Sequence, residues 1–315
     1  MGKFLFKIFL FIIPVGILFV IIFFVKTERY FAYHYTKGDC DGRGLFFYNK
    51  IYKEKNSIDY IFIGSSKTMN GINDSMMQRI INTKITTPIN IYNAGYCRYG
   101  RNLNFIFLKE FLKNHSIKKV FFEVLPDEAT NSHPMFPFIA TSDEIISSAN
   151  GFNPSIFSDT YNHFLMNLKY ERCKFNLDYC DSIPVQQCKF GYNNIPQIAD
   201  SKSLAKFIEI KTIEWNHYNS TIDKTAPDYK FSNYYLNEIK TICEKNNIEL
   251  NFIYLSSYGN IIKTPAWKEE YEKMGKLIIA PDSIFLRKMY WKDNSHFNSY
   301  GADAFSKFLI TQISP

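Results

Sequence analysis

The sequence lacks the features that are typical of nucleic-acid-binding and zinc-binding proteins. Its formal net charge of +7 comes from lysines scattered over the whole length, without a dense Lys/Arg run of the kind that binds nucleic acid. None of the six cysteines forms a CxxC pair, and the histidines do not cluster near them. We therefore expect no metal, no cofactor and no nucleic-acid partner. A basic surface near anionic lipid or an anionic cell surface fits the charge better.

The chain also has no internal repeat and no low-complexity tract. Its 315 residues allow one large domain or two small ones and can bury a substantial core. The aromatic fraction of 17% resembles that of carbohydrate-binding proteins, but Phe, Tyr, Ile, Asn and Lys are all abundant here, as expected of an AT-rich genome. The aromatic content alone therefore does not assign a function.

An uncharged apolar run at residues 8–25 lies between Lys7 and Lys26. Its length is near the minimum for a membrane-spanning helix, roughly 17–25 residues. A cleaved signal peptide is the alternative, but charged residues follow the run directly and no small-x-small cleavage site is present. We therefore predict an uncleaved single-pass anchor at residues 1–25 in the cytoplasmic membrane, with the remaining domain outside the cytoplasm, periplasmic or extracellular. A cytoplasm-facing membrane protein remains the alternative.

Three of the cysteines, Cys173, Cys180 and Cys188, crowd into one polar segment. In an oxidising compartment they could cross-link a loop, and we expect at least one disulfide to involve this cluster. Cys243 lies in a helix-like run beside Ile239 and Ile242, which favours a free buried thiol there.

Apolar strands alternate with amphipathic helices over most of the chain, after a polar and aromatic stretch at 26–57 that reads as a juxtamembrane connector. The pattern predicts strands at 58–63, 89–92, 119–125 and 249–255, and helices at 67–81, 102–112, 234–245, 266–276 and 299–311. Such alternation indicates a parallel sheet with right-handed crossovers. We predict an α/β fold, a three-layer α/β/α sandwich with a flavodoxin-like parallel sheet, over residues 58–315.

Residues 126–230 do not follow the alternation and are expected to form an insertion. The segment holds seven prolines and the cysteine cluster, and its pattern predicts one or two helices at most, the best at 202–215. Insertions in such domains usually lie at the carboxyl ends of strands, where they shape a site. A subdomain without a role in the site is the alternative.

Chemistry-bearing residues follow the predicted strands. Ser65 and Ser66, after Gly64, follow the first strand, and Asp293 precedes His296 by three residues, just before the last helix. An Asp and a His at this spacing can hydrogen-bond across a turn, and the base then needs a nucleophile. Taken singly, the serines fit a helix N-cap equally well. Taken together, the residues indicate a catalytic triad.

These motifs resemble those of the SGNH (GDSL-type) hydrolase superfamily over about 58–125 and 234–312. The resemblance implies that Ser66 is the nucleophile, with Ser65 in place of the usual Asp, and that Asp293 and His296 are orienter and general base. Gly95, after the second strand, resembles the glycine of the second block. The Gly-Ser-Ser variant resembles the membrane-anchored branch of DltD-like and alginate-acetyltransferase-like proteins, which act on cell-envelope polymers.

The oxyanion hole is the least regular part of the resemblance. The family's third block places an Asn after the third strand, whereas this strand is followed by Pro126 and Asp127. The candidate donors are therefore the backbone N–H groups of Ser66 and Gly95 and the side chain of Asn131. Arg98 and Arg101 flank the Gly95 loop and either hold an anionic acceptor or are solvated at a helix start.

The expected function is serine-dependent acyl transfer through an acyl-Ser66 intermediate, as an O-acetyl or O-acyl transferase or an esterase acting on a cell-envelope polysaccharide or another acyl acceptor. A membrane-bound O-acyltransferase is a candidate partner, since the anchor places the domain beside a membrane-embedded acyl donor. The alternative is a catalytically silent SGNH scaffold that binds glycan or such a membrane partner.

Overall fold

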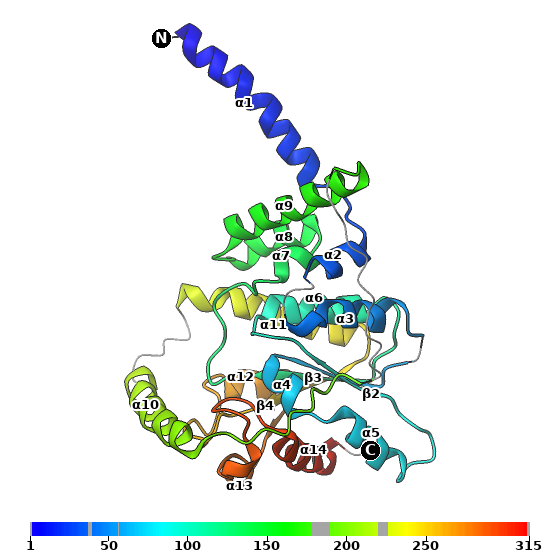
Figure 1. The fold of residues 1–315 in the computed structure, drawn as a ribbon, viewed down its shortest axis with the longest axis vertical. Coiled ribbons are helices and arrows are strands. Elements are labelled where there is room, and N and C mark those ends of the chain that lie inside the picture. The colour runs from blue at the N-terminus through cyan, green and yellow to red at the C-terminus, as the bar shows by residue number, and fades with distance from the viewer. Residues whose placement is uncertain (1, 37–39, 56, 178–189, 220–225, 314–315) are drawn as a thin grey trace.

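A computed structural model describes residues 2–36, 40–55, 57–177, 190–219 and 226–313. The fold is α/β and is built on five parallel strands in the order β2–β1–β3–β4–β5 (Figure 1). The strands are β1 (Tyr60–Gly64), β2 (Ile91–Gly95), β3 (Lys119–Val124), β4 (Glu249–Tyr254) and β5 (Lys276–Ile279). The predicted α/β fold with a parallel sheet is therefore confirmed. β5 was missed, because its four residues are too few to show a strand pattern after a helix.

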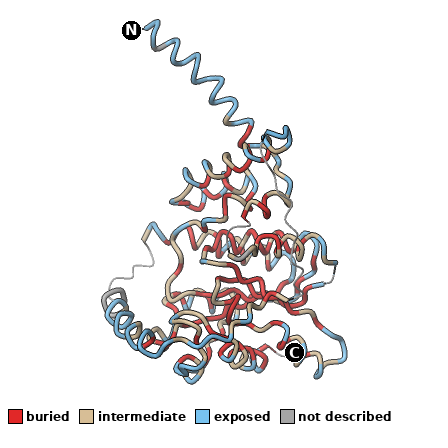
Figure 2. Tube along the Cα trace, in the orientation of Figure 1, coloured by how far each residue is buried: buried red, intermediate tan, exposed pale blue. Residues whose placement is uncertain are grey.

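Helices pack on both faces of the sheet, and each face has its own apolar core (Figures 1 and 2). Successive side chains of β1 point to opposite faces, so Ile61 and Ile63 enter one core and Tyr60 and Phe62 the other. The first core is covered by α3 (Arg43–Tyr52), α6 (Arg101–Leu112), α11 (Lys230–Lys245) and α12 (Lys268–Met274). The second is covered by α4 (Ser66–Gly71), α5 (Asp74–Asn82), α13 (Asp282–Phe285) and α14 (Ser299–Ile313).

The single helix predicted at 67–81 is two helices, α4 and α5. α4 ends at Gly71, and the side chain of Asn73 caps α5 by accepting a hydrogen bond from the backbone N–H of Met76 at 3.0 Å. Asn at an N-cap satisfies one of the donors that the first turn leaves unpaired. The apolar spacing runs through this break, which is why the sequence pattern did not show it.

The segment predicted as a connector contributes to the core. It contains α2 (Arg29–Tyr35), the short 3-10 helix η1 (Cys40–Gly42) and α3. Phe47 and Ile51 of α3 are fully buried, and the rings of Phe47 and Phe107 lie 4.4 Å apart. These contacts fix α3 against α6 on the sheet.

Three of the four cysteines that the structure describes are disulfide-bonded. Cys40 and Cys97 form a disulfide that spans 57 residues and ties η1 to the loop after β2, and the sequence did not predict this pair. Cys173 is also disulfide-bonded, which confirms that a disulfide involves the predicted cluster. Cys180 and Cys188 lie outside the described residues. Cys243 is a free buried thiol, as predicted.

The insertion at 126–230 contains more helices than its sequence predicted. They are α7 (Phe136–Ile139), α8 (Ser142–Ser148), α9 (Ile156–Lys174) and α10 (Ser201–Asn219), with the 3-10 helices η2 (Ala149–Gly151) and η3 (Pro227–Tyr229). A further 3-10 helix, η4 (Lys288–Tyr290), precedes α14. The buried face of α9 includes Asp159, His163 and Asn167 beside Met166 and Tyr170. Because polar residues occupy that face, apolar periodicity does not reveal the helix.

The N-terminal helix α1 (Gly2–Phe23) projects from the body and is exposed along most of its length (Figures 1 and 2). Its length and composition are sufficient to cross a membrane. Its last turn is fixed by the insertion, since Asn167 Nδ2 and Ser142 Oγ donate to the carbonyl of Phe23 at 2.9 and 2.7 Å. The carbonyls that a helix end leaves unpaired are thus satisfied by α8 and α9.

Replacing Phe47 by Ala tests whether the N-terminal segment belongs to the folded domain. Removal of a fully buried Phe side chain should lower the free energy of unfolding by about 3–5 kcal/mol. Phe157→Ala is the matched control, because Phe157 is 88% exposed and its loss should change stability by less than about 0.5 kcal/mol. Denaturant titration of the detergent-solubilised chain measures both. Equal, small effects would show that α3 is only a connector.

Candidate active site

The nucleophile turn connects β1 to α4 over the carboxyl edge of the sheet. β1 ends at Gly64, Ser65 is the N-cap in an extended conformation, and Ser66 is the first residue of α4. A Cβ at Gly64 would lie 2.1 Å from Thr68 Oγ1 and 2.6 Å from Glu123 Oε2. A side chain does not fit at this position, because the turn passes close to Glu123 at the end of β3.

The buried carboxylate of Glu123 holds this turn in place. Its Oε2 accepts hydrogen bonds from the backbone N–H of Ser65 at 2.8 Å and of Thr68 at 3.2 Å, and from the Thr68 hydroxyl at 2.6 Å. Its Oε1 accepts from the Ser65 hydroxyl at 2.7 Å. Ser65 Oγ in turn accepts from the N–H of Lys67 at 3.1 Å. The side chain of Ser65 is therefore structural, and that of Ser66 stays available.

Sequence reasoning missed Glu123, although one signal was present. It is the only charged residue inside the apolar stretch of β3, and its side chain is 1% exposed. A charge in a buried strand requires partners, because an unpaired buried carboxylate is strongly unfavourable.

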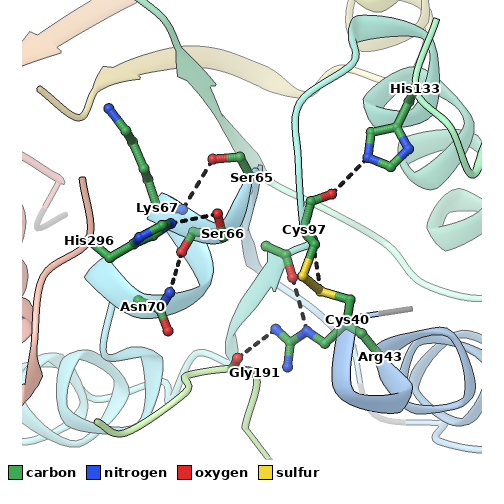
Figure 3. Close-up of a disulfide and its surroundings, with 11 residues drawn as sticks. Cys40, Arg43, Ser65, Ser66, Lys67, Asn70, Cys97, His133, Gly191 and His296 are labelled. Carbon is green, nitrogen blue, oxygen red and sulfur yellow. Dashed lines mark hydrogen bonds between the residues drawn. A yellow bond between two sulfur atoms is a disulfide. The ribbon is translucent and has the colours of Figure 1, made fainter. Parts of the chain in front are cut away.

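The structure brings Ser66, His296 and Asp293 together. Ser66 Oγ lies 2.7 Å from His296 Nε2 (Figure 3). His296 Nδ1 lies 3.0 Å from both carboxylate oxygens of Asp293. Figure 3 shows the imidazole turned toward the Ser66 hydroxyl at the start of α4. This is the order nucleophile, base and orienting carboxylate of a serine triad.

The Asp293–His296 turn is fixed from both sides. Asp293 Oδ1 accepts hydrogen bonds from the backbone N–H groups of Ser295 and His296 at 2.8 and 2.9 Å. This Asx-type turn places the His296 imidazole beside the Asp293 carboxylate. On either side of the turn, Trp291 and Phe297 pair as an isolated antiparallel bridge, with ring centroids 4.5 Å apart in the second core. The bridge between Trp291 and Phe297 therefore holds His296 in position in the absence of substrate.

The charges around the triad favour an ionised Asp293. Partial burial alone would raise the pKa of this carboxyl, but hydrogen bonds from the His296 ring and from the backbone N–H groups of Ser295 and His296 hold the pKa at about 2. Lys67 Nζ donates to Leu255 O and Ser257 Oγ, both at 3.1 Å. Burial lowers the pKa of Lys67, and the nearby carboxylates of Glu123 and Asp293 oppose that shift.

The three candidate oxyanion donors differ in availability. In the part of the chain that the structure describes, the Ser66 N–H has no partner, whereas the N–H groups of Ser65, Lys67 and Thr68 are all used. The Gly95 N–H donates to Asn93 Oδ1 at 2.9 Å. Asn131 is exposed in the loop after β3, and no described contact joins it to Ser66.

The side chain of Asn93 instead holds the C-terminal end of α4, the helix that begins at Ser66. Its Nδ2 donates to the carbonyls of Thr68 and Ile72 at 2.8 and 2.7 Å, which satisfies the C-terminal end of α4. A Cβ on Gly95 would meet the backbone of Met69 at 2.3 Å, so the glycine allows α4 to pack on β2. The second block of the resemblance thus positions α4 in this fold.

The insertion returns to this same edge of the sheet. The backbone N–H of Gly191 donates to Asp74 Oδ2 at 2.8 Å, and that of Asn193 donates to Met69 O at 3.0 Å. From the other side, Arg43 of α3 donates to the carbonyls of Gly95 and Gly191 at 3.0 and 2.6 Å (Figure 3). Residues far apart in the sequence therefore brace α4.

Arg101 does not face the site. Its side chain is fully buried and forms an ion pair with Glu128, which also accepts a hydrogen bond from the Tyr271 hydroxyl. Its guanidinium further donates to Glu123 O at 3.2 Å. Both sequence interpretations of Arg101, an anion site and a solvated helix start, are therefore wrong. Arg98 is exposed on the same loop.

A cleft of about 570 Å³ opens beside the triad. Its lining includes Ser295, which precedes His296 in the chain, and Ser257, whose hydroxyl accepts a hydrogen bond from Lys67. The cleft therefore reaches the neighbourhood of the triad. Its other lining residues are mostly aromatic and aliphatic: Pro126, Phe207, Lys211, Glu214, Trp215, Tyr254, Ser256, Tyr258, Ile261 and Ile262. Because α10 supplies one wall, the insertion shapes the cleft.

Comparison with known proteins assigns no family to the chain. No protein-family model matches the sequence, and no curated protein is significantly similar to it. Within the described ranges, no group of three or more His, Cys, Asp or Glu side chains is arranged to hold a metal ion. Any functional assignment therefore depends on the geometry of the site.

Replacing Glu123 tests its control of the nucleophile turn. Glu123→Ala should leave two backbone N–H groups and two hydroxyls without their acceptor and lower the free energy of unfolding by about 4 kcal/mol or more, since each unsatisfied buried donor costs about 1–3 kcal/mol. Glu123→Gln keeps the shape and one carbonyl oxygen, so its loss should be about 1–2 kcal/mol. Denaturant titration compares the two. Equal losses would argue against a hydrogen-bonding role.

The pKa of Asp293 predicts a defined pH dependence. Its folded-state value of about 2 lies below the ordinary 3.8, so its interactions stabilise the fold fully above about pH 5 and are lost as the pH falls through about 2. The difference in unfolding free energy between the wild type and Asp293→Asn should therefore stay constant above about pH 5 and shrink toward pH 2. Denaturant titrations at several pH values measure it. A difference that grows on acidification would be the opposite result.

Proposed function

We propose that this chain is a serine-dependent acyl-transfer enzyme of the SGNH type that acts on a cell-envelope polysaccharide. The observation that carries the proposal is the 2.7 Å contact between Ser66 Oγ and His296 Nε2, with Asp293 behind the imidazole. The strand order β2–β1–β3–β4–β5 is that of flavodoxin-like sheets, and the helices on both faces fit a three-layer sandwich. Both features support the SGNH assignment.

In the first half-reaction, Ser66 Oγ attacks the carbonyl carbon of the acyl donor as His296 Nε2 takes the hydroxyl proton. Asp293 stabilises the resulting imidazolium through Nδ1. The tetrahedral oxyanion is stabilised by the Ser66 N–H, at the positive end of α4. The carbon–oxygen bond to the leaving group then breaks, the leaving group takes the proton from His296, and the acyl group remains on Ser66.

In the second half-reaction, His296 removes a proton from the acceptor hydroxyl, whose oxygen attacks the acyl carbon. The bond between that carbon and Ser66 Oγ then breaks, and Ser66 Oγ takes the proton back from His296. A sugar hydroxyl makes the enzyme a transferase, and water makes it an esterase. The aromatic-lined cleft beside Ser295 and Ser257 can hold an acceptor sugar, which favours transfer to a sugar hydroxyl over hydrolysis. We therefore favour the transferase, supplied with acyl groups by a membrane-bound O-acyltransferase.

The location we propose is the outer side of the cytoplasmic membrane, with α1 as a single-pass anchor. The length and apolar composition of α1 support the anchor. The disulfide bonds of Cys40, Cys97 and Cys173 support an oxidising, extracytoplasmic compartment. The domain would then be held beside a membrane-embedded acyl donor.

A second candidate function is a catalytically silent scaffold that binds glycan or a membrane partner. It is favoured by the oxyanion hole, because the Gly95 N–H is already bonded to Asn93 and Asn131 has no described contact with Ser66. Loss of one donor typically lowers the rate by about 10²–10³-fold. A scaffold would not require the aligned triad, which is why we rank it second.

A reactive-serine probe separates the two candidates. Incubated with a fluorophosphonate, the full-length chain in detergent should be labelled on Ser66, as located by peptide mass spectrometry. Ser66→Ala should abolish labelling, and His296→Ala should slow it by roughly 10⁴–10⁶-fold, because triad residues act as a unit.

Ser65→Ala is the matched control, since the Ser65 hydroxyl is bonded to Glu123 and does not face His296. It should retain most of the labelling, with some loss of stability. If Ser65→Ala alone abolishes labelling, the nucleophile is misassigned by one residue. If neither serine is labelled while the chain is folded and binds glycan, the scaffold function is correct.

A further inference from the structure

The helix α9 carries an apolar stripe that the proposed chemistry does not use. Phe157, Tyr161, Phe164 and Leu168 are spaced by four, three and four residues, so they lie on one face of the helix. Phe157 and Tyr161 are 88% and 57% exposed, and the other two are partly covered. The opposite face holds the buried residues that pack α9 on the body. α9 therefore presents an apolar stripe, partly exposed to solvent, on the side away from the body.

The stripe is continuous with α1. The rings of Phe164 and Phe19 stack with centroids 4.5 Å apart, and α9 crosses just beneath the end of α1 in Figure 1. Asn167 on α9 and Ser142 on α8 donate to the carbonyl of Phe23, which fixes the angle between the two helices. The exposed residues Phe157 and Tyr161 thus extend an apolar surface sideways from the base of α1.

The position of this surface along α1 matches the boundary of a bilayer. Phe19 lies four residues before the last residue of α1, a rise of roughly 6 Å along the helix axis. Interfacial amphipathic helices bury their apolar face roughly 5–10 Å into the region between head groups and acyl chains. If α1 spans the membrane to its end, the stripe on α9 lies within that region.

Polar groups occupy the next level away from α1. A hollow of about 650 Å³ beside the end of α1 is lined in part by Lys26, Lys113 and Ser142 and by the carboxylates Glu28 and Asp143. Head groups lie just outside the hydrocarbon, where polar and charged side chains remain solvated. The order from apolar stripe to polar hollow of mixed charge follows the order of layers in a membrane surface.

We propose that α9 lies in the outer interface of the lipid bilayer and inserts Phe157 and Tyr161 among the lipids, so that the protein is held by a spanning helix and a surface helix together. A single spanning helix can tilt and rotate within the bilayer, and the domain fixed to its end moves with it. A second apolar contact restricts that motion, and the side of the domain that faces the membrane is fixed. The inference rests on the proposed anchoring of α1 and not on the proposed chemistry.

Lipid-borne quenching tests this placement in the full-length chain. A fluorescent bimane is attached at Phe157→Cys, and the protein is reconstituted into vesicles of phosphatidylcholine and phosphatidylglycerol with or without a nitroxide-labelled phospholipid. Position 157 is 88% exposed, so the label does not disturb the core. About a two-fold or greater loss of fluorescence is expected with the nitroxide lipid, because the label lies at the acyl-chain boundary.

Two further labelled positions make the outcome decisive. A bimane at Leu10→Cys in α1 should be quenched, and one at Leu286→Cys, which is 54% exposed beside α13, should not be. Quenching at 10 without quenching at 157 would overturn the proposal. Quenching at neither would overturn it together with the anchor, while leaving Ser66 labelling unaffected. A concentration-dependent shift at 157 in detergent, without lipid quenching, would assign the stripe to a second copy of the chain instead.

Discussion

The carboxylate of Glu123 is the interaction on which the candidate site depends. Four hydrogen bonds from Ser65 and Thr68 converge on it, and the lack of a side chain at Gly64 lets β1 pass close enough to form them. The nucleophile turn is thereby tied to β3, the central strand, instead of resting on loop contacts. Because Ser65 is held by this carboxylate, the next side chain must point away from it, and that direction leads to His296.

Three stretches that are distant in sequence meet around this turn. Arg43 comes from the N-terminal segment, Gly191 from the insertion and His296 from the last loop, and each contacts α4 or the end of β2. A turn braced from several directions keeps its geometry without bound substrate, which is the preorganisation that acyl transfer requires. The insertion and the N-terminal segment are therefore part of the site's support, and α10 also forms a wall of the cleft.

The features that were predictable from the sequence are those with a local signal. Four of the five strands are predominantly apolar, and Asp293 and His296 are close enough in sequence to meet across one turn. The features that were missed depend on distant partners. The role of Glu123 depends on its hydrogen bond with Ser65, and that of Arg101 on its ion pair with Glu128. α9 shows no apolar periodicity because polar residues occupy its buried face. These features depend on contacts between residues that are distant in sequence, and a local sequence pattern does not reveal such contacts.

Ser66 and His296 lie 230 residues apart in the chain, so the candidate site is among the last parts of the molecule to be completed. During synthesis α1, the nucleophile turn and both ends of the Cys40–Cys97 bridge emerge before the Asp293–His296 turn exists. Closing so long a loop is entropically unfavourable and is compensated when α14 packs on α4 and α5. A nascent or truncated chain therefore presents Ser66 without His296, and the triad forms only when the C-terminal part of the chain has folded.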